Sequence, residues 1–297
     1  MNYTSCTLCP RECCVDRTTG EIGYCGKTSS LSLARAALHM WEEPCISGEE
    51  GSGTVFFSGC NLRCVYCQNR EIAIGDSGKN VCDDRLVEIF FELKDKGANN
   101  INLVTPTHYL PHIVKSLEKA KSCGLDIPIV YNTSGYEKPE AIRLLDGLVD
   151  IYLPDFKYYS PELSFEYSNA MDYAEFAKKS LAEEFRQVGK PLFDERGIMQ
   201  KGIIVRHLVL PGQAEDSKRI LKYLYETYGN DIYVSIMSQY TPLAVMKDHP
   251  LLSRKLFYYE YEEVVDYAVE LGIENGFLQD GEAAEESFIP PFDNSGI

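Results

Sequence analysis

Residues 54–67 read Thr-Val-Phe-Phe-Ser-Gly-Cys-Asn-Leu-Arg-Cys-Val-Tyr-Cys. The first five have the apolar character of a buried strand, and Cys60, Cys64 and Cys67 follow in a C-x3-C-x2-C loop. Thiolates are preferred ligands of iron-sulfur clusters and of zinc, and a tight loop can bring three of them to one cofactor. Three ligands on a four-iron cluster leave one iron open, whereas a zinc knuckle is the alternative for this spacing.

Apolar runs alternate with helical patterns along the rest of the chain. Near-continuous apolar strands are typical of parallel sheets covered on both faces. Six successive strand-helix units predict a parallel sheet with right-handed crossovers, either an open doubly wound sheet or a complete or partial barrel. Both architectures place chemistry at the carboxyl ends of the strands. The expected strands are Thr54–Ser58, Ile101–Val104, Ile127–Tyr131, Val149–Leu153, Gly202–Val209 and Ile232–Ile236.

Helices between these strands follow from a 3.6-residue apolar period and from glycine stops. The first is expected to begin at Asp83 or Asp84 and to stop at Gly97. Residues 158–200 contain a longer crossover helix but no recognisable functional motif. The remaining helices are expected to end near Gly124, Gly147, Gly189, Gly229 and Gly272.

The composition favours a soluble protein of the cytoplasm. The chain has 297 residues with 29 basic and 45 acidic side chains, a formal net charge of −16. This charge repels phosphate backbones, so nucleic acid is not an expected partner. No apolar run could span a membrane, and residues 1–6 lack the features of a signal peptide, so no membrane association is expected. Residues 256–297 carry eleven acids and no Lys or Arg, which is typical of a solvated helix and tail.

Eleven cysteines in a reducing compartment indicate metal or redox chemistry. Four thiolates near the amino end could close a zinc site or hold an auxiliary cluster, and Cys14 could replace the third of them. These four are Cys6, Cys9, Cys13 and Cys25. Three isolated cysteines are expected to be small buried hydrophobic residues, namely Cys45, Cys82 and Cys123.

The chain divides into three segments on this basis. Residues 1–50 are expected to form a cysteine-rich metal-binding module, and residues 51–280 the barrel or sheet domain. The glycine-rich stretch 49–53 marks the boundary between them. Residues 281–297 are expected to be an extended tail.

The three-cysteine loop, with an aromatic residue before its last cysteine, resembles the signature of the radical S-adenosylmethionine superfamily. That resemblance implies a partial (β/α)6 barrel, in agreement with the six units counted above. Residues 56–64 are especially similar to homologues of the pyruvate formate-lyase activating enzyme. Further similar stretches are Cys6–Cys13, Asn102–His108, Tyr131–Tyr136, Leu153–Lys157 and Arg206–Gly212.

The resemblance implies that Cys60, Cys64 and Cys67 hold a [4Fe-4S] cluster whose fourth iron binds S-adenosylmethionine. Reductive cleavage of this cofactor would give methionine and a 5′-deoxyadenosyl radical that abstracts hydrogen from the substrate. An electron donor such as flavodoxin or ferredoxin would reduce the cluster. The eight-cysteine insertion of some activating enzymes is absent after Cys67.

Residues at later strand ends are similar to cofactor-binding motifs of the family. Thr105 and Thr107 stand where many members have a Gly-Gly-Glu turn, and their hydroxyls could accept hydrogen bonds from an ammonium group. Asn132 and Ser134 fall in a stretch that resembles Asp-Thr-Asn-Gly. The aromatic Tyr66 belongs to the cluster motif itself.

The pair Asp155 and Lys157 resembles an Asp-x-Lys motif associated with S-adenosylmethionine and a monovalent cation. Lys157 could pair with the methionine carboxylate, and Asp155 could hold the cation or orient the lysine. Asn132 in place of an aspartate removes one hard anionic ligand from that cation site. Arg206 and His207 alternate along the fifth strand, so at most one of them is expected to face the barrel, and His207 is kept as the candidate.

The resemblance to activating enzymes suggests a protein or peptide substrate, for instance a glycine that becomes a glycyl radical. One alternative is a radical enzyme that acts on a small metabolite. Another is a noncatalytic iron-sulfur or zinc scaffold, which the missing Gly-Gly-Glu and the acidic carboxyl end would favour.

Overall fold

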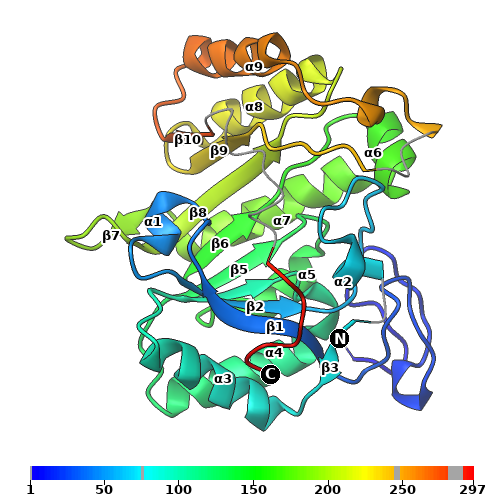
Figure 1. Cartoon of the computed structure of the whole chain (residues 1–297), viewed down its shortest axis with the longest axis vertical. Helices are drawn as coiled ribbons and strands as arrows, with labels where there is room; N and C mark the ends of the chain where they lie inside the picture. Colours follow the sequence, from blue (N-terminus) through cyan, green and yellow to red (C-terminus); the bar gives the residue numbers. More distant parts are fainter. Residues whose placement is uncertain (1, 75–76, 244–247, 280–289) are drawn as a thin grey trace.

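The chain forms a twisted, mostly parallel sheet surrounded by helices, the mixed α/β class expected from the sequence (Figure 1). The computed structural model describes residues 2–74, 77–243, 248–279 and 290–297. The strands are β1 (Ser32–His39), β2 (Ser52–Phe57), β3 (Lys79–Asn80), β4 (Ile101–Val104), β5 (Ile129–Thr133), β6 (Ile151–Pro154), β7 (Leu192–Phe193), β8 (Met199–Leu208), β9 (Tyr233–Met237) and β10 (Gly276–Leu278).

The strand order identifies a partial barrel rather than a doubly wound sheet. The six expected strands appear as β2, β4, β5, β6, β8 and β9, which pair in chain order, each parallel to the next. A doubly wound sheet would reverse its order at a switch point. β5 begins two residues later than expected, directly after Pro128, because proline has no N–H to donate to a neighbouring strand. The carboxyl ends of these strands therefore meet at one rim.

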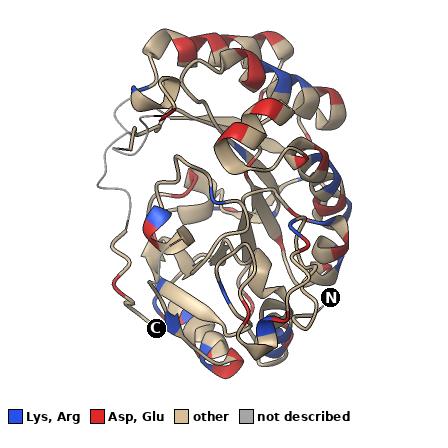
Figure 2. Ribbon diagram, turned by 90° about the vertical axis from the view of Figure 1, so that its right-hand side faces the viewer, with Lys and Arg blue, Asp and Glu red and all other residues tan. Residues whose placement is uncertain are grey.

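Helices cover the outside of the sheet, and charged side chains lie mainly on these helices (Figure 2). α7 is amphipathic and turns Ala177 and Leu181 toward the core. None of the helices within the described ranges is long and apolar enough to cross a bilayer. The α-helices are α1 (Pro44–Ser47), α2 (Arg70–Ile74), α3 (Asp83–Asp95), α4 (Leu110–Ser122), α5 (Pro139–Ile142), α6 (Pro161–Ser168), α7 (Tyr173–Val188), α8 (Ala214–Tyr228) and α9 (Tyr258–Leu271).

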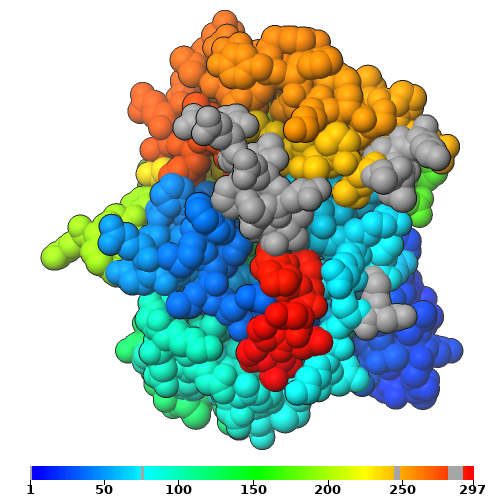
Figure 3. Space-filling view, viewed as in Figure 1, coloured from blue at the N-terminus to red at the C-terminus, as the bar shows by residue number. Residues whose placement is uncertain are grey.

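The sheet begins earlier in the chain than expected. β1 pairs with β2 in antiparallel fashion, so residues 32–39 belong to the sheet although they precede the boundary placed at residue 51. The last residues of the chain lie beside β1 (Figures 1 and 3). Ala36 N donates to Ser295 O at 2.9 Å, and Asn294 N donates to Ala34 O at 3.1 Å. Residues 290–297 of the expected tail thus pack on β1, and residues 281–289 lie outside the described residues.

One helix lies where the sequence analysis found no motif. α6 begins at Pro161 after Ser160, whose hydroxyl accepts a hydrogen bond from Leu163 N at 3.4 Å. The helix ends at Asn169, which adopts left-handed backbone angles. Its caps are visible in the sequence, but Phe165 is exposed and the apolar stripe is weak, so periodicity alone does not reveal the helix.

Two carboxyl groups are buried next to α7. Glu137 and Glu184 are both inaccessible to solvent. The Thr107 and Thr133 hydroxyls donate to one oxygen of Glu137. The second Glu137 oxygen and both Glu184 oxygens have no hydrogen-bond partner among the described residues. Burial raises the pKa of Glu137 to about 7, and burial together with the Glu137 charge raises the pKa of Glu184.

Because the pKa values of these carboxyl groups are raised, we expect the free energy of unfolding to fall as pH rises. The unfolded chain releases the Glu137 proton near the ordinary pKa of 4.5, whereas the folded chain keeps it to about pH 7. The folded state therefore binds more protons between these values, and the free energy of unfolding decreases by about 3 kcal/mol over this range. In Glu137→Gln, which mimics the protonated form, that part of the pH dependence should disappear.

Urea unfolding at pH 5 and pH 8 measures the difference, with the exposed Glu118→Gln as the control. From pH 5 to pH 8 the free energy of unfolding of the wild type should fall by about 3 kcal/mol more than that of Glu137→Gln. The free energy of unfolding of Glu118→Gln should change with pH as that of the wild type does. Parallel curves for wild type and Glu137→Gln would contradict the prediction.

Candidate functional site

A cavity of about 250 Å³ opens at the carboxyl ends of the parallel strands. Three cysteines line it from the loop after β2, so the structure brings Cys60, Cys64 and Cys67 to one space. Most of the other predicted cofactor-binding residues also line this cavity. They are Tyr66, Thr105, Asn132, Ser134, Asp155 and Lys157.

Burial and the neighbouring thiols shift the pKa values of the cysteines in this loop. Burial raises the pKa of Cys60, and burial with the neighbouring Cys64 raises the pKa of Cys67 to about 12, while Lys157 lowers both. In the part of the chain that the structure describes, no three His, Cys, Asp or Glu side chains converge on a single metal ion. A four-iron cluster binds each thiolate through a different iron, so its ligands stand farther apart than those of one zinc ion. Three thiols around one cavity fit a four-iron cluster that keeps one iron open.

A chain of alternating charges runs from this cavity into the barrel. Lys157 Nζ lies 2.7 Å from Asp155 Oδ2, and Arg206 Nε donates to Asp155 Oδ1 at 3.1 Å. Arg206 also donates to Asn132 Oδ1 at 2.7 Å and to Glu42 Oε2 at 3.3 Å. Burial alone would raise the pKa of Asp155, but Lys157 and Arg206 lower it below its ordinary value. The carboxylate is thus held in its charged form between two cations.

The inward residue of β8 is Arg206, not His207. The His207 ring lies on the other side of the strand, with Nδ1 2.7 Å from Phe156 O and Nε2 2.8 Å from the Ser217 hydroxyl of α8. Burial lowers the pKa of His207 to about 4, so the ring is neutral at pH 7. Alternation correctly predicted that at most one of the two faces inward, but the choice of His207 was wrong. A core histidine satisfied by two hydrogen bonds is the simpler role for it.

Of the two threonines after β4, one lines the cavity and the other does not. Thr105 lines the cavity with a backbone φ of 58°, a left-handed conformation that is uncommon for a β-branched residue. Thr107 is buried and donates its hydroxyl to Glu137, so it does not reach the cavity. The prediction that Thr107 binds the cofactor is therefore wrong. Its hydroxyl bond to Glu137 supports the turn instead.

Tyr66 is packed by three other tyrosines behind the cysteine loop. Its ring forms edge contacts with Tyr158, Tyr167 and Tyr240, with centroids 6.2 to 6.4 Å apart. The Tyr158 hydroxyl donates to the Tyr66 hydroxyl at 2.8 Å. The backbone is tied down as well, because Val65 N donates to Tyr167 O at 2.9 Å. The aromatic position of the motif thus orders the loop that carries the thiols.

Two arginines of the amino-terminal segment bind the barrel mouth, Arg11 at this loop and Arg17 at the turn after β4. Arg11 donates to the carbonyls of Asn61 at 2.8 Å and Leu62 at 3.3 Å, both between Cys60 and Cys64. Arg17 is 1% exposed and donates to the His108 carbonyl at 2.8 Å. The amino-terminal residues accordingly lie against the part of the chain that contains the cysteine loop (Figure 3).

The amino-terminal thiols themselves lie close to this contact. Cys13 Sγ accepts a hydrogen bond from Tyr24 N at 3.1 Å and lies with Cys25 Sγ around Gly23, where an added Cβ would be 3.4 and 3.8 Å from the two sulfurs. Cys14 points to solvent instead, so Cys13 is the better fourth member of this group. Cys6, Cys9 and Cys25 are buried.

The isolated cysteines differ from expectation. Cys45 is buried, as predicted, but Cys82 and Cys123 are exposed. Cys82 caps α3 by accepting a hydrogen bond from Arg85 N at 3.4 Å, and Cys123 ends α4. A position at a helix end outweighs the general tendency of cysteine to be buried.

Two residues of the site, Glu42 and the inward-facing Arg206, were not predicted from the sequence. Glu42 lies between β1 and α1, far in sequence from any motif, and accepts hydrogen bonds from Asn102 at 3.1 Å and Asn132 at 3.4 Å. Alternation along β8 was a signal for Arg206. For Glu42 the sequence carries no local signal, because only the packing of residues 40–48 against the barrel interior brings it there.

Comparisons with known proteins agree with this geometry. The model of the Radical SAM superfamily matches residues 54–224. The uncharacterized protein MJ0674 of Methanocaldococcus jannaschii is 29% identical over 276 residues, which cover 90% of this chain and 75% of that protein.

Similar solved structures have low sequence identity. Streptococcus suis SuiB bound to S-adenosylmethionine is 16% identical with a TM-score of 0.49, covering 74% of this chain and 48% of SuiB. The FeFe-hydrogenase maturase HydG from Carboxydothermus hydrogenoformans is 15% identical with a TM-score of 0.46, covering 80% of this chain and 59% of HydG. The chain thus spans about half the length of SuiB.

The superfamily match covers more than half of the chain. It includes most of β2, the three-cysteine loop and the strand ends from β4 to β8 that line the cavity. The chain therefore belongs to the radical SAM superfamily, whose members use a [4Fe-4S] cluster and S-adenosylmethionine.

Proposed function

We propose that this protein is an enzyme that reductively cleaves S-adenosylmethionine at a [4Fe-4S] cluster held by Cys60, Cys64 and Cys67. The observation that carries the proposal is that the three thiols and the Asp155–Lys157 ion pair line one cavity at the carboxyl ends of the strands. When bound, the cluster and S-adenosylmethionine would supply a 5′-deoxyadenosyl radical. The protein's own contribution is to orient the cofactor and exclude water.

The charged and the uncharged residues of the cavity have different roles in cofactor binding. Lys157 is positioned to pair with the carboxylate of the methionine moiety, because Asp155 fixes its ammonium from one side only. Asn132, Ser134 and Thr105 offer uncharged donors and acceptors along the same wall. Tyr66 serves to keep the loop ordered.

Arg206 takes the place of the monovalent cation that the resemblance implied. Its guanidinium already lies between Asp155 and Asn132, the two positions similar to the cation motif. An arginine keeps its charge at any ordinary pH and binds several acceptors through a fixed fork. A separate sodium or potassium ion is then unnecessary at this position.

The substrate in this proposal is a protein or peptide, and the reaction resembles that of glycyl-radical activating enzymes. The stretches around Cys60, Asn132 and Asp155 that are similar to those enzymes support this assignment. A flavodoxin or ferredoxin is the proposed reductant. Activity in the cytoplasm would suit both the reduced cluster and the free thiols.

Residues 1–50 are proposed to bind a second metal through Cys6, Cys9, Cys13 and Cys25. The support is the clustering of Cys13 and Cys25 around Gly23 and the burial of three of the four thiols. The metal in this proposal is zinc or an iron-sulfur cluster. Arg11 would transmit the order of this module to the barrel domain, residues 51–280, through the cysteine loop.

The main prediction is cleavage of S-adenosylmethionine by the reduced protein. Anaerobically reconstituted protein, treated with dithionite, should form 5′-deoxyadenosine, which chromatography detects. Cys64→Ala should abolish product because it removes one of three cluster ligands. The matched control Cys123→Ala changes an exposed cysteine at a helix end and should keep full activity. Absence of product from wild type with an intact cluster would make the site structural or electron-carrying.

A second prediction concerns Arg206, whose removal leaves Glu42 and Asp155 without a shared cation. Arg206→Met should lower the free energy of unfolding by about 3–5 kcal/mol, as expected for a buried pair that loses one partner. The exposed Arg196→Met is the control and should lose less than about 1 kcal/mol. Urea denaturation followed by circular dichroism measures both.

Equal losses in the two arginine variants would contradict the role of Arg206. The cation proposal has its own readout, because wild-type cleavage of S-adenosylmethionine should be unchanged when choline replaces sodium and potassium. A rate that depends on either metal ion would exclude the guanidinium as its substitute.

A third prediction tests the amino-terminal metal. Wild-type protein purified without oxygen should contain more metal than the three-cysteine cluster explains, measured by elemental analysis for zinc and iron. Cys9→Ser should lose that excess and keep the rest, whereas the exposed Cys14→Ser should lose none. Identical metal content in wild type, Cys9→Ser and Cys14→Ser would contradict the proposal of a second metal site.

A further inference from the structure

A second cavity, of about 490 Å³, adjoins the cysteine-lined cavity. The two cavities share Arg206, Met237 and Gln239 as lining residues. One wall of the second cavity comes from residues 40–48, between β1 and β2, and the opposite wall comes from β9 and β10. A molecule bound there would touch the same residues that close the cysteine-lined cavity.

The lining of this cavity has more acidic than basic side chains. Glu42, Glu43 and Arg206 are its charged lining residues within the described ranges. Arg206 is already shared between Glu42, at 3.3 Å, and Asp155, at 3.1 Å. Glu43 therefore has no cation of its own in the cavity wall.

Glu43 is the unusual group of the three. It is 8% exposed, and its Oε2 atom has no hydrogen-bond partner among the described residues. Burial raises the pKa of Glu43 above its ordinary value, and Arg206 offsets this only in part. A buried carboxylate in this state is costly unless a cation or a proton joins it. A positively charged group on a ligand would remove that cost.

Beside the polar Ser47, Ser235, Gln239 and Gln279, the lining has an accessible apolar part. Met40 and Trp41 are 43% and 64% exposed, and Leu278 is 56% exposed on the opposite wall. Phe277 and Met237 extend this apolar surface toward the shared wall. The cavity thus presents, beneath an apolar entrance, one carboxylate that is paired with Arg206 and one, that of Glu43, that has no cation of its own.

We propose that the second cavity is the substrate site and that it binds an ammonium group carried on an apolar chain, with Glu43 as the partner of the ammonium. The proposal deepens the proposed function and rests on it, since it identifies the chemistry of the substrate that meets the cysteine-lined cavity. A lysine side chain and the amino end of a peptide offer the same chemistry. The overall charge of −16 would favour the approach of such a cation.

The chain contains a built-in reporter for this site, because Trp41 is its single tryptophan. Full-length reconstituted protein, without reductant or S-adenosylmethionine, would be titrated with pentylamine and with 1-pentanol while Trp41 fluorescence is recorded. Pentylamine should give a saturable change, and pentanol should bind at least about tenfold more weakly because it lacks the charge. Isothermal titration calorimetry supplies a measure independent of Trp41.

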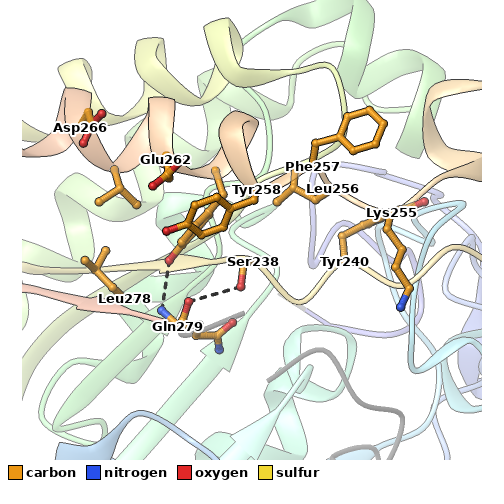
Figure 4. Close-up of a pocket in the computed structure, with 12 residues that line it drawn as sticks. Ser238, Tyr240, Lys255, Leu256, Phe257, Tyr258, Glu262, Asp266, Leu278 and Gln279 are labelled. Carbon is orange, nitrogen blue, oxygen red and sulfur yellow. Dashed lines mark hydrogen bonds between the residues drawn. The ribbon is translucent and has the colours of Figure 1, made fainter. Parts of the chain in front are cut away.

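Glu43→Gln should weaken pentylamine binding about 10- to 100-fold and leave pentanol unchanged. The matched control is Glu262→Gln, since Glu262 lies on α9 beside a different cavity (Figure 4). It should bind pentylamine as wild type does. Equal affinity of wild type for amine and alcohol, a comparison that needs no variant, would overturn the proposal, as would undiminished amine binding by a folded Glu43→Gln protein.

Two further probes distinguish the sources of the ammonium. Nα-acetyl-lysine methylamide carries the lysine side chain, and leucine amide carries an α-amine, so the tighter ligand identifies the source. Binding of neither, with pentylamine bound, would limit the site to small free amines and overturn its use for peptides. Because no S-adenosylmethionine is cleaved in these titrations, the outcome is separate from that of the 5′-deoxyadenosine assay.

Discussion

One guanidinium, that of Arg206, holds the interior of the barrel mouth together. Its hydrogen bonds reach Asp155 after β6, Asn132 on β5 and Glu42 in the segment before α1. Three strand ends and one connecting segment therefore depend on a single fork of N–H donors. A buried ion pair of this kind contributes little net stability compared with apolar packing, but it fixes which groups face each other. That geometry leaves Lys157 with one free side toward the cysteines and Glu43 without a cation.

The amino-terminal segment adds a mechanical link to this electrostatic one. Arg11 binds carbonyls inside the three-cysteine loop, and Arg17 binds the carbonyl of His108 after β4. Carbonyl oxygens in irregular loops need donors when they are buried, and these arginines supply them. The cysteines of the first 25 residues therefore belong to a segment that contacts both the three-cysteine loop and the turn after β4.

The sequence predicted the six parallel strands and the three-cysteine loop because each is a local pattern, whereas the partial barrel followed from the family resemblance. It also placed most of the cavity residues, since the carboxyl ends of parallel strands must meet. It chose His207 over Arg206 because alternation tells which residues differ in direction but not which one faces inward. It missed β1, whose pairing with β2 depends on contacts distant from any motif, and Glu42, which only tertiary packing brings to Arg206.

The packing of residues 290–297 on β1 has a consequence for the solution behaviour of the protein. Ser295 and Asn294 occupy main-chain groups of Ala36 and Ala34 on the side of β1 that faces away from β2. Phe292 covers Phe56 at a centroid distance of 5.3 Å. Exposed strand edges are the places where sheets of different molecules join and aggregate. The segment thus shields the part of this edge that β3 leaves unpaired, and it does so with the chain's own backbone rather than with a second subunit.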